Sequence, residues 1–160
     1  MILEQINSDL IAFMKDREPA RKEENQLKVM TLRTLLAEVK SFLVNNRKEP
    51  TDQEVSIILA KAIKQFRETH DNASGNNAAG VIREDIATQE KSKIATLEKY
   101  LPTQMSKTEI EALVVSAISQ AGATSAKDMG AVMAIIRPLT QGKADGKVVS
   151  EVVKAKLAGG

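Results

Sequence analysis

Apolar residues recur along this chain at spacings of three and four, which places them on one face of an α-helix. No stretch shows the sustained alternation of apolar and polar residues, bounded by hairpin turns, that is typical of a half-buried strand. The pattern therefore predicts an all-α protein.

Residues 1–101 are expected to form a bundle of long antiparallel helices. The first helix ends near the charged, proline-containing stretch KDREPARKEE, and the second, longer helix ends near NNRKEP. The predicted apolar stripes are Ile6, Leu10, Phe13 and Met14 in the first helix, and Leu32, Leu35, Leu36, Val39, Phe42 and Leu43 in the second.

The sequence TDQE at 51–54 has the form of a capping box, which marks the start of a third helix. The Thr51 hydroxyl and the Glu54 carboxylate can each accept a hydrogen bond from the other residue's backbone amide. The apolar face of this helix is predicted to be Val55, Ile58, Leu59, Ala62 and Phe66, and its wet face Lys61, Lys64 and Arg67.

The next stretch, DNASGNNAAG at 71–80, is rich in residues that break helices. It therefore predicts a loop. A fourth helix is expected from about Val81 to Tyr100, and Pro102 closes it.

A second capping-box sequence, SKTE at 106–109, follows that proline, so LPTQMS is the expected boundary between a domain at 1–101 and a domain at 106–160. The second domain should hold three shorter helices, the middle one capped by Ser125 with Asp128 in place of the usual glutamate. Their stripes are Ile110, Leu113, Val114, Ala117 and Ile118; Met129, Val132, Met133 and Ile136; and Val149, Val152, Val153 and Leu157.

Composition excludes several kinds of chemistry. The 160 residues include no cysteine and a single histidine, His70, so we expect no metal and no cofactor. No residue is spaced to activate His70, and no catalytic residue is assigned. The apolar runs are far too short to span a bilayer, and the N-terminus MILEQINSDL carries acids where a signal peptide carries bases. We therefore expect a cytoplasmic protein with no membrane partner.

Positive charge is unevenly distributed, although the net charge is only +2. Residues 28–67 hold eight basic and four acidic side chains, residues 123–160 hold six and three, and residues 68–122 hold five and eight. The two basic segments add attraction for phosphates, but such an excess is also common on surfaces that bind nothing.

The stretch QGKADGK at 141–147 combines structural residues with two lysines. Gly142 stands where a helix end favours a left-handed residue, Asp145 stands where the next helix needs an N-cap acceptor, and Gly146 follows it. Lys143 and Lys147 are less simply explained, because positive charge is mildly unfavourable at a helix N-terminus. Beside exposed backbone amides the two lysines form a candidate phosphate site; the alternative is a turn and a cap with incidental lysines.

A second group of cations lies on the second long helix. Arg33, Lys40 and Arg47 recur every seven residues along one edge of its apolar stripe, as a weaker candidate RNA contact or as a solvated margin whose stems cover the core. Aromatic platforms for stacking bases are missing. Any RNA contact would therefore read the shape and backbone of a folded RNA.

Three segments together, LEKYLPTQMSKTEIEALV, GATSAKDMGAVM and GKADGKVVSEVVKAKL, resemble the YqeY family of bacterial proteins in their order and spacing. LRTLLAEVKSF and TDQEVSIILAKAIKQFRET extend the resemblance through the N-terminal half. Between Glu68 and Asp85 the chain is longer and richer in Asn, Gly and Ala than the family pattern.

The resemblance implies a helical domain followed by a small three-helix domain. It also implies a relation to the C-terminal tail of the GatB subunit of glutamine-dependent aspartyl/glutamyl-tRNA amidotransferase, where the tail helps to hold the tRNA. The catalytic parts of that enzyme are absent from this sequence, so a carbon–nitrogen ligase label would be inherited from the larger enzyme.

Three functions remain open from the sequence. The first is a noncatalytic tRNA-binding module that uses cations against phosphates. The second is a protein-interaction module that docks on amidotransferase subunits or another partner. The third, an intrinsic glutamine-dependent ligase, predicts turnover by the isolated chain, and we expect none. The candidate RNA contacts of the first are Lys143, Lys147, Lys127, Arg137 and Lys154.

Overall fold

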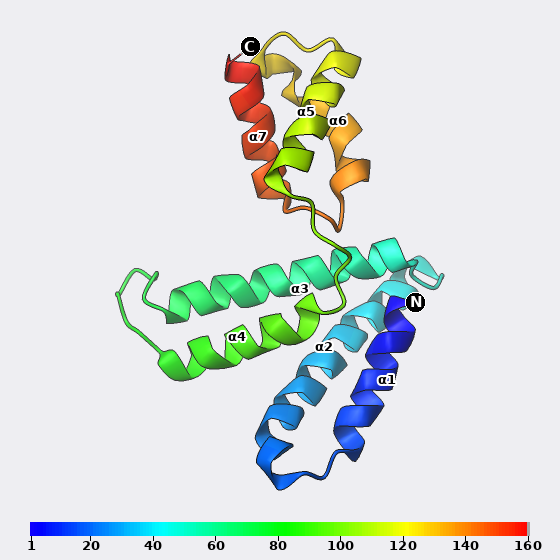
Figure 1. The fold of residues 1–160 in the computed structure, drawn as a ribbon, viewed down its shortest axis with the longest axis vertical. Helices are drawn as coiled ribbons and strands as arrows, with labels where there is room; N and C mark the ends of the chain where they lie inside the picture. The colour runs from blue at the N-terminus through cyan, green and yellow to red at the C-terminus, as the bar shows by residue number, and fades with distance from the viewer. Residues whose placement is uncertain (160) are drawn as a thin grey trace. The chain divides into compact units, whose positions relative to one another are not determined.

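The regular elements of residues 1–159, which a computed structural model describes, are all helices (Figure 1). The all-α prediction is confirmed. The elements are α1 (Ile2–Lys15), η1 (Pro19–Arg21), α2 (Lys22–Asn46), α3 (Asp52–Ala73), α4 (Glu84–Glu98), α5 (Lys107–Ala121), η2 (Ala126–Asp128), α6 (Met129–Thr140) and α7 (Gly146–Gly159). They pack into two units, one spanning Met1–Leu101 and a C-terminal unit that begins at Pro102.

The first unit consists of two antiparallel hairpins, α1–α2 and α3–α4, which cross each other (Figure 1). Burial of one face of each helix against the others supplies the main stabilisation, since removal of apolar surface from water is the dominant favourable contribution to folding. Its buried core consists of Ile6, Leu32, Leu35, Val55, Leu59, Ala62, Ile63, Leu97 and Tyr100.

Tyr100 joins the two hairpins of the first unit by a polar contact as well as by packing. Its hydroxyl donates a hydrogen bond of 2.6 Å to the Asp9 carboxylate of α1. Burial of the phenol and this bond both raise the pKa of Tyr100. The contact ties the segment that follows α4 to α1.

The start of α3 follows the predicted capping box. The Thr51 hydroxyl accepts from the Glu54 amide at 3.3 Å, and the Glu54 carboxylate accepts from the Thr51 amide at 2.9 Å. Lys48 also donates to Glu54 at 2.6 Å, and this bond is the main reason that the pKa of Glu54 is lowered. The first four backbone amides of a helix have no hydrogen-bond partner within the helix. A local network that supplies such partners therefore fixes where α3 begins.

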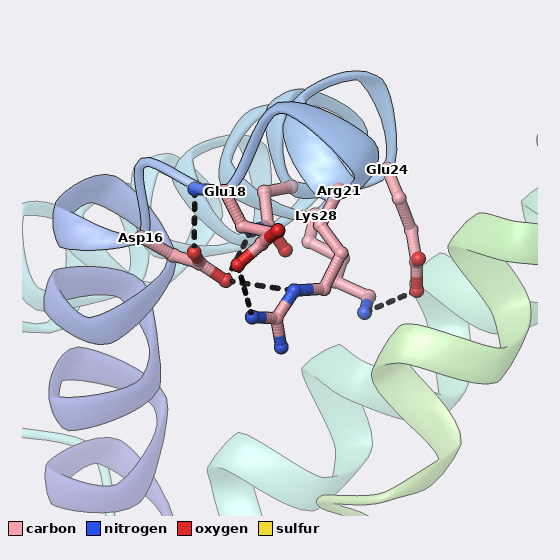
Figure 2. Close-up of polar contacts among 6 residues, drawn as sticks. Asp16, Glu18, Arg21, Glu24 and Lys28 are labelled. Carbon is pink, nitrogen blue, oxygen red and sulfur yellow. Dashed lines mark hydrogen bonds and ion pairs between the residues drawn. The ribbon is translucent and has the colours of Figure 1, made fainter.

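The α1–α2 turn is held by a carboxylate at the end of α1 (Figure 2). Asp16 accepts from the backbone amide of Glu18 at 3.0 Å and from the side-chain amide of buried Asn25 at 2.9 Å, and its Oδ2 lies 3.4 Å from Arg21 Nε. These bonds, the Glu18 amide first, lower the pKa of Asp16. The turn therefore has a defined geometry that sets α1 beside α2.

The α3–α4 connection differs from the prediction. Helix α3 continues to Ala73, and α4 begins at Glu84 instead of near Val81. The residues before α4 pair back with the end of α3, since the Arg83 amide donates to the Ala73 carbonyl at 2.6 Å and Ser74 forms an isolated antiparallel bridge with Ile82. Their backbone groups are engaged across the connection and are not available to a helix.

Two residues assigned to apolar stripes are exposed. Met14 is 54% exposed and Leu43 is 39% exposed. Both stand near the C-terminal ends of their helices. Periodicity identified the face of each helix correctly but not how far along it the core extends.

The C-terminal unit contains the three predicted helices and a separate core. Ser106 and Glu109 form the predicted capping box at the start of α5, and Gly122 ends α5 with a φ of 62°. The buried core consists of Ile110, Val114, Ala117, Val132, Ile136, Val149, Val152, Val153 and Leu157.

Candidate nucleic-acid interface

The turn between α6 and α7 is tied to the segment that leads into α5. Gly142 has a φ of 78°, in the left-handed region where a glycine carries no steric penalty. The carbonyl of Gly142 accepts from Gln104 Nε2 at 3.2 Å, and the carbonyl of Lys143 accepts from the Met105 amide at 2.9 Å. The backbone of Lys143 is therefore fixed while its side chain is exposed.

The N-terminus of α7 is capped by Asp145, the residue directly before the helix. Asp145 Oδ1 accepts from the Lys147 amide at 2.8 Å, and the Asp145 carbonyl accepts from the Val149 amide at 3.0 Å. An anion approaching the Lys147 amide would meet this negative charge. Any phosphate at this turn therefore has to be held by lysine side chains and not by that amide.

Two of the candidate cations share the solvent face of α7. Lys147 and Lys154 are seven residues apart, which places them nearly in line and about 10 Å apart along the axis. Both are exposed, whereas Val149 and Val153 on the opposite side are 1% and 0% exposed. Glu151 lies between the two lysines on the same face and reduces the local positive charge.

The chain topology separates the remaining candidates. Arg137 lies in the last turn of α6, so it stands at the same end of the C-terminal unit as Lys143 and Lys147. Lys127 lies in η2, in the α5–α6 connection, at the opposite end of the unit (Figure 1). Both side chains are exposed. The structure therefore gathers Arg137, Lys143 and Lys147 at one end and leaves Lys127 apart.

The cations of the C-terminal unit form no ion pair with the carboxylates of the same unit in the described residues. Seven of its residues are Lys or Arg, and none of them forms an ion pair within residues 102–159; every ion pair of the described chain lies in the first unit. Three of the five carboxylates instead accept from backbone amides at helix starts. These three are Glu109, Asp128 and Asp145.

Two of these capping carboxylates have a lowered pKa. The backbone amide of Ser106 is the main cause for Glu109, and the backbone amide of Thr124 is the main cause for Asp128. Both groups are therefore ionised at neutral pH, but their charge is directed at backbone donors. It does not neutralise the lysines.

The second candidate row, on α2, is shorter than the sequence indicated. Helix α2 ends at Asn46, and Arg47 follows it with a φ of 54°, so its side chain leaves the line of Arg33 and Lys40. The interpretation of three cations in one row is therefore wrong at its third member. Arg33 and Lys40 remain exposed on the helix.

Replacing Arg47 with glycine is expected to raise the free energy of unfolding by about 0.5–1 kcal/mol, because a Cβ is strained in the left-handed conformation. Urea unfolding followed by circular dichroism measures the change. Arg47→Ala removes the same charge but keeps the Cβ, so it should give no such gain. Equal stabilisation by both substitutions would show that charge, and not backbone strain, is the cause.

Sequence reasoning missed the residues that tether the turn. Gln104 and Met105 act through a side-chain amide and a backbone amide, and neither group carries a sequence signal for a partner nearly forty residues away. It also left out Lys107 and Lys156, two further cations of the same unit, which line a shallow groove between α5 and α7.

Within residues 1–159, no helix is both long and apolar enough to cross a membrane. In the same residues, no three His, Asp or Glu side chains are grouped so that they could hold a metal ion.

The fold and the surface define a class: a small all-helical protein in which a unit of two crossed hairpins precedes a three-helix unit with unpaired cations. The sequence profile described as "Yqey-like protein" matches residues 3–157, and the chain belongs to the YqeY family. No curated protein matches the chain.

Proposed function

We propose that this YqeY-family chain is a noncatalytic accessory protein that binds folded tRNA through its C-terminal unit. The observation that carries the proposal is the set of exposed cations without ion-pair partners in residues 102–159. Arg137, Lys143 and Lys147 are the primary contacts, and Lys154 continues the surface along α7. Lys127, at the far end of the unit, is a separate contact.

A folded RNA fits this unit better than an open strand. Single-strand binding proteins stack bases on aromatic side chains, and residues 102–160 contain no Phe, Tyr or Trp. Lysines on a rigid turn instead recognise the spacing of phosphates on a preformed surface, as double-stranded and folded RNAs provide.

The resemblance to the GatB tail identifies tRNA as the RNA to test. It also supports a role beside a tRNA-dependent amidotransferase, with the chemistry performed by that enzyme's own domains. This accessory role requires neither an acid–base pair nor an activated nucleophile in the candidate interface.

The double substitution Lys143→Ala/Lys147→Ala is expected to weaken binding of full-length tRNA about tenfold, or 1.4 kcal/mol. It should also reduce the magnitude of the log–log salt slope by about 2, because two phosphate contacts are lost. Electrophoretic mobility shift with total tRNA measures the affinity, and circular dichroism checks that the helices are intact.

The matched control is Lys61→Ala/Lys64→Ala, which removes the same charge from the exposed face of α3, outside the C-terminal unit. It should weaken binding much less. An equal loss of tRNA affinity in both double variants would mean that only the net charge attracts RNA. Undiminished affinity in Lys143→Ala/Lys147→Ala would mean that RNA contacts another part of the chain.

A further inference from the structure

The outer face of α2 carries an apolar row and a basic row in the same register. Met30, Ala37 and Val44 are seven residues apart, and Arg33 and Lys40 lie between them with the same spacing. At 100° per residue the five positions fall within about 80° of one another around the helix. All five side chains are exposed, Met30 at 56% and Val44 at 63%.

This α2 outer face points away from the core. Leu32, Leu35 and Val39, on the opposite side of the helix, are 0%, 2% and 7% exposed. The core therefore does not require apolar residues at Met30 and Val44. A seven-residue repeat on an exposed helix is the pattern by which a second helix packs alongside it at a shallow angle.

Helix α1 widens the same surface. Arg33 Nη2 lies 3.7 Å from Met14 Sδ, so the basic row reaches across to α1. Ile11, one turn from Met14 on α1, is 51% exposed. The Asp16 network at the α1–α2 turn holds the two helices in this arrangement (Figure 2). The surface is thus preformed and combines flexible methionines with two cations.

Charge decides against a second copy of the chain as the occupant. Pairing α2 with itself in the parallel sense sets Arg33 against Arg33, and in the antiparallel sense sets Arg33 beside Lys40. Within residues 30–44 no acidic residue shares the outer face; Glu23, seven residues before Met30, precedes the row in the first turn of α2, and Glu38 lies on the margin of the face and is partly buried. Like charges brought together at an interface oppose association.

The apolar row decides against RNA. A phosphate backbone could contact Arg33 and Lys40, but it offers nothing that removes the row of Met30, Ala37 and Val44 from water. Because Arg47 leaves the line, only two cations remain over about 21 Å of helix. An occupant that satisfies both rows has to be apolar along one line and acidic along the next.

We propose that the α2 outer face, with Met14 and Ile11 beside it, docks an acidic amphipathic α-helix of a partner protein. The partner places apolar side chains against Met30, Ala37 and Val44, and its Glu or Asp side chains pair with Arg33 and Lys40. The helix lies along α2 at the shallow crossing typical of heptad packing. This inference does not depend on tRNA binding by the C-terminal unit.

The test uses synthetic helix-stapled peptides of about three heptads with leucine at the core positions and glutamate beside them. Fluorescence anisotropy with the full chain measures affinity. The acidic peptide should bind at least about tenfold more tightly than a copy with lysine for glutamate, and than a copy with serine for leucine. Arg33→Glu/Lys40→Glu should reverse the preference to the lysine peptide, and Met30→Ser/Val44→Ser should weaken both.

Lys61→Glu/Lys64→Glu is the matched control, because it makes the same charge change on the exposed face of α3. It should leave peptide affinity unchanged. Equal affinities for the three peptides, or an equal loss in the α3 variant, would overturn the proposal. Two other results would also overturn it. One is that no peptide binds and Arg33→Glu/Lys40→Glu abolishes tRNA binding. The other is that the chain sediments as a dimer and Met30→Ser/Val44→Ser converts it to a monomer.

Discussion

Raising the salt concentration from about 50 to about 200 mM is expected to weaken binding of full-length tRNA about 60- to 250-fold. The physical reason is release of counterions from the RNA when lysines and arginine neutralise its phosphates. Contact with four or so phosphates gives a log–log slope of about −3 to −4, and the fourfold rise in salt converts this slope into the stated loss.

Mobility-shift titrations at several salt concentrations provide the slope directly. A slope near zero would contradict the cationic interface, because a contact through exposed lysines cannot be indifferent to salt. Absence of binding at the lowest salt would contradict tRNA as the partner. The Lys143→Ala/Lys147→Ala variant, measured in the same titration, separates the contribution of the α6–α7 turn from that of the other cations.

Leu32→Ala is expected to lower the free energy of unfolding of the first unit by about 2–5 kcal/mol. The Leu32 side chain is fully buried in the core between the hairpins, so its truncation loses apolar contact and leaves a cavity. Urea unfolding followed by circular dichroism gives the loss. Leu43→Ala, at a residue that is 39% exposed, is the matched control and should cost much less.

The same variant tests whether the two units unfold separately. The two buried cores have no residue in common. In the Leu32→Ala variant, at urea concentrations that unfold the first unit, we therefore expect the methyl groups of Val114, Val132 and Ile136 to keep their native NMR chemical shifts. Simultaneous loss of both sets of resonances at one urea concentration would contradict independent stability.

Helix boundaries were predictable where a local hydrogen-bond network sets them. Thr51 with Glu54, and Ser106 with Glu109, lie three residues apart, so the sequence alone contains both partners of each capping box. The α3–α4 connection was not predictable in this way. Its geometry rests on the Arg83 amide meeting the Ala73 carbonyl across the loop, a contact that periodicity does not encode.

The candidate site was predictable to a similar degree. The turn at Gly142 and the bond to Asp145 follow from residue types beside one another in the chain. The packing of the three helices decides which cations lie at the same end of the C-terminal unit. This packing places Lys127 at the opposite end from Lys143. Arg47 shows the converse, because a single left-handed residue after α2 removes it from a row that the seven-residue spacing indicated.

The bond between Tyr100 and Asp9 gives the protein an internal optical reporter. Tyr100 is the only tyrosine of the chain and there is no tryptophan, so nearly all ultraviolet emission arises in the first unit. A carboxylate bonded to a phenol quenches its emission, so separation of α1 from α4 would brighten the signal. The C-terminal unit contributes no such emission. When RNA is bound to that unit, the tyrosine fluorescence therefore still reports on the two hairpins alone.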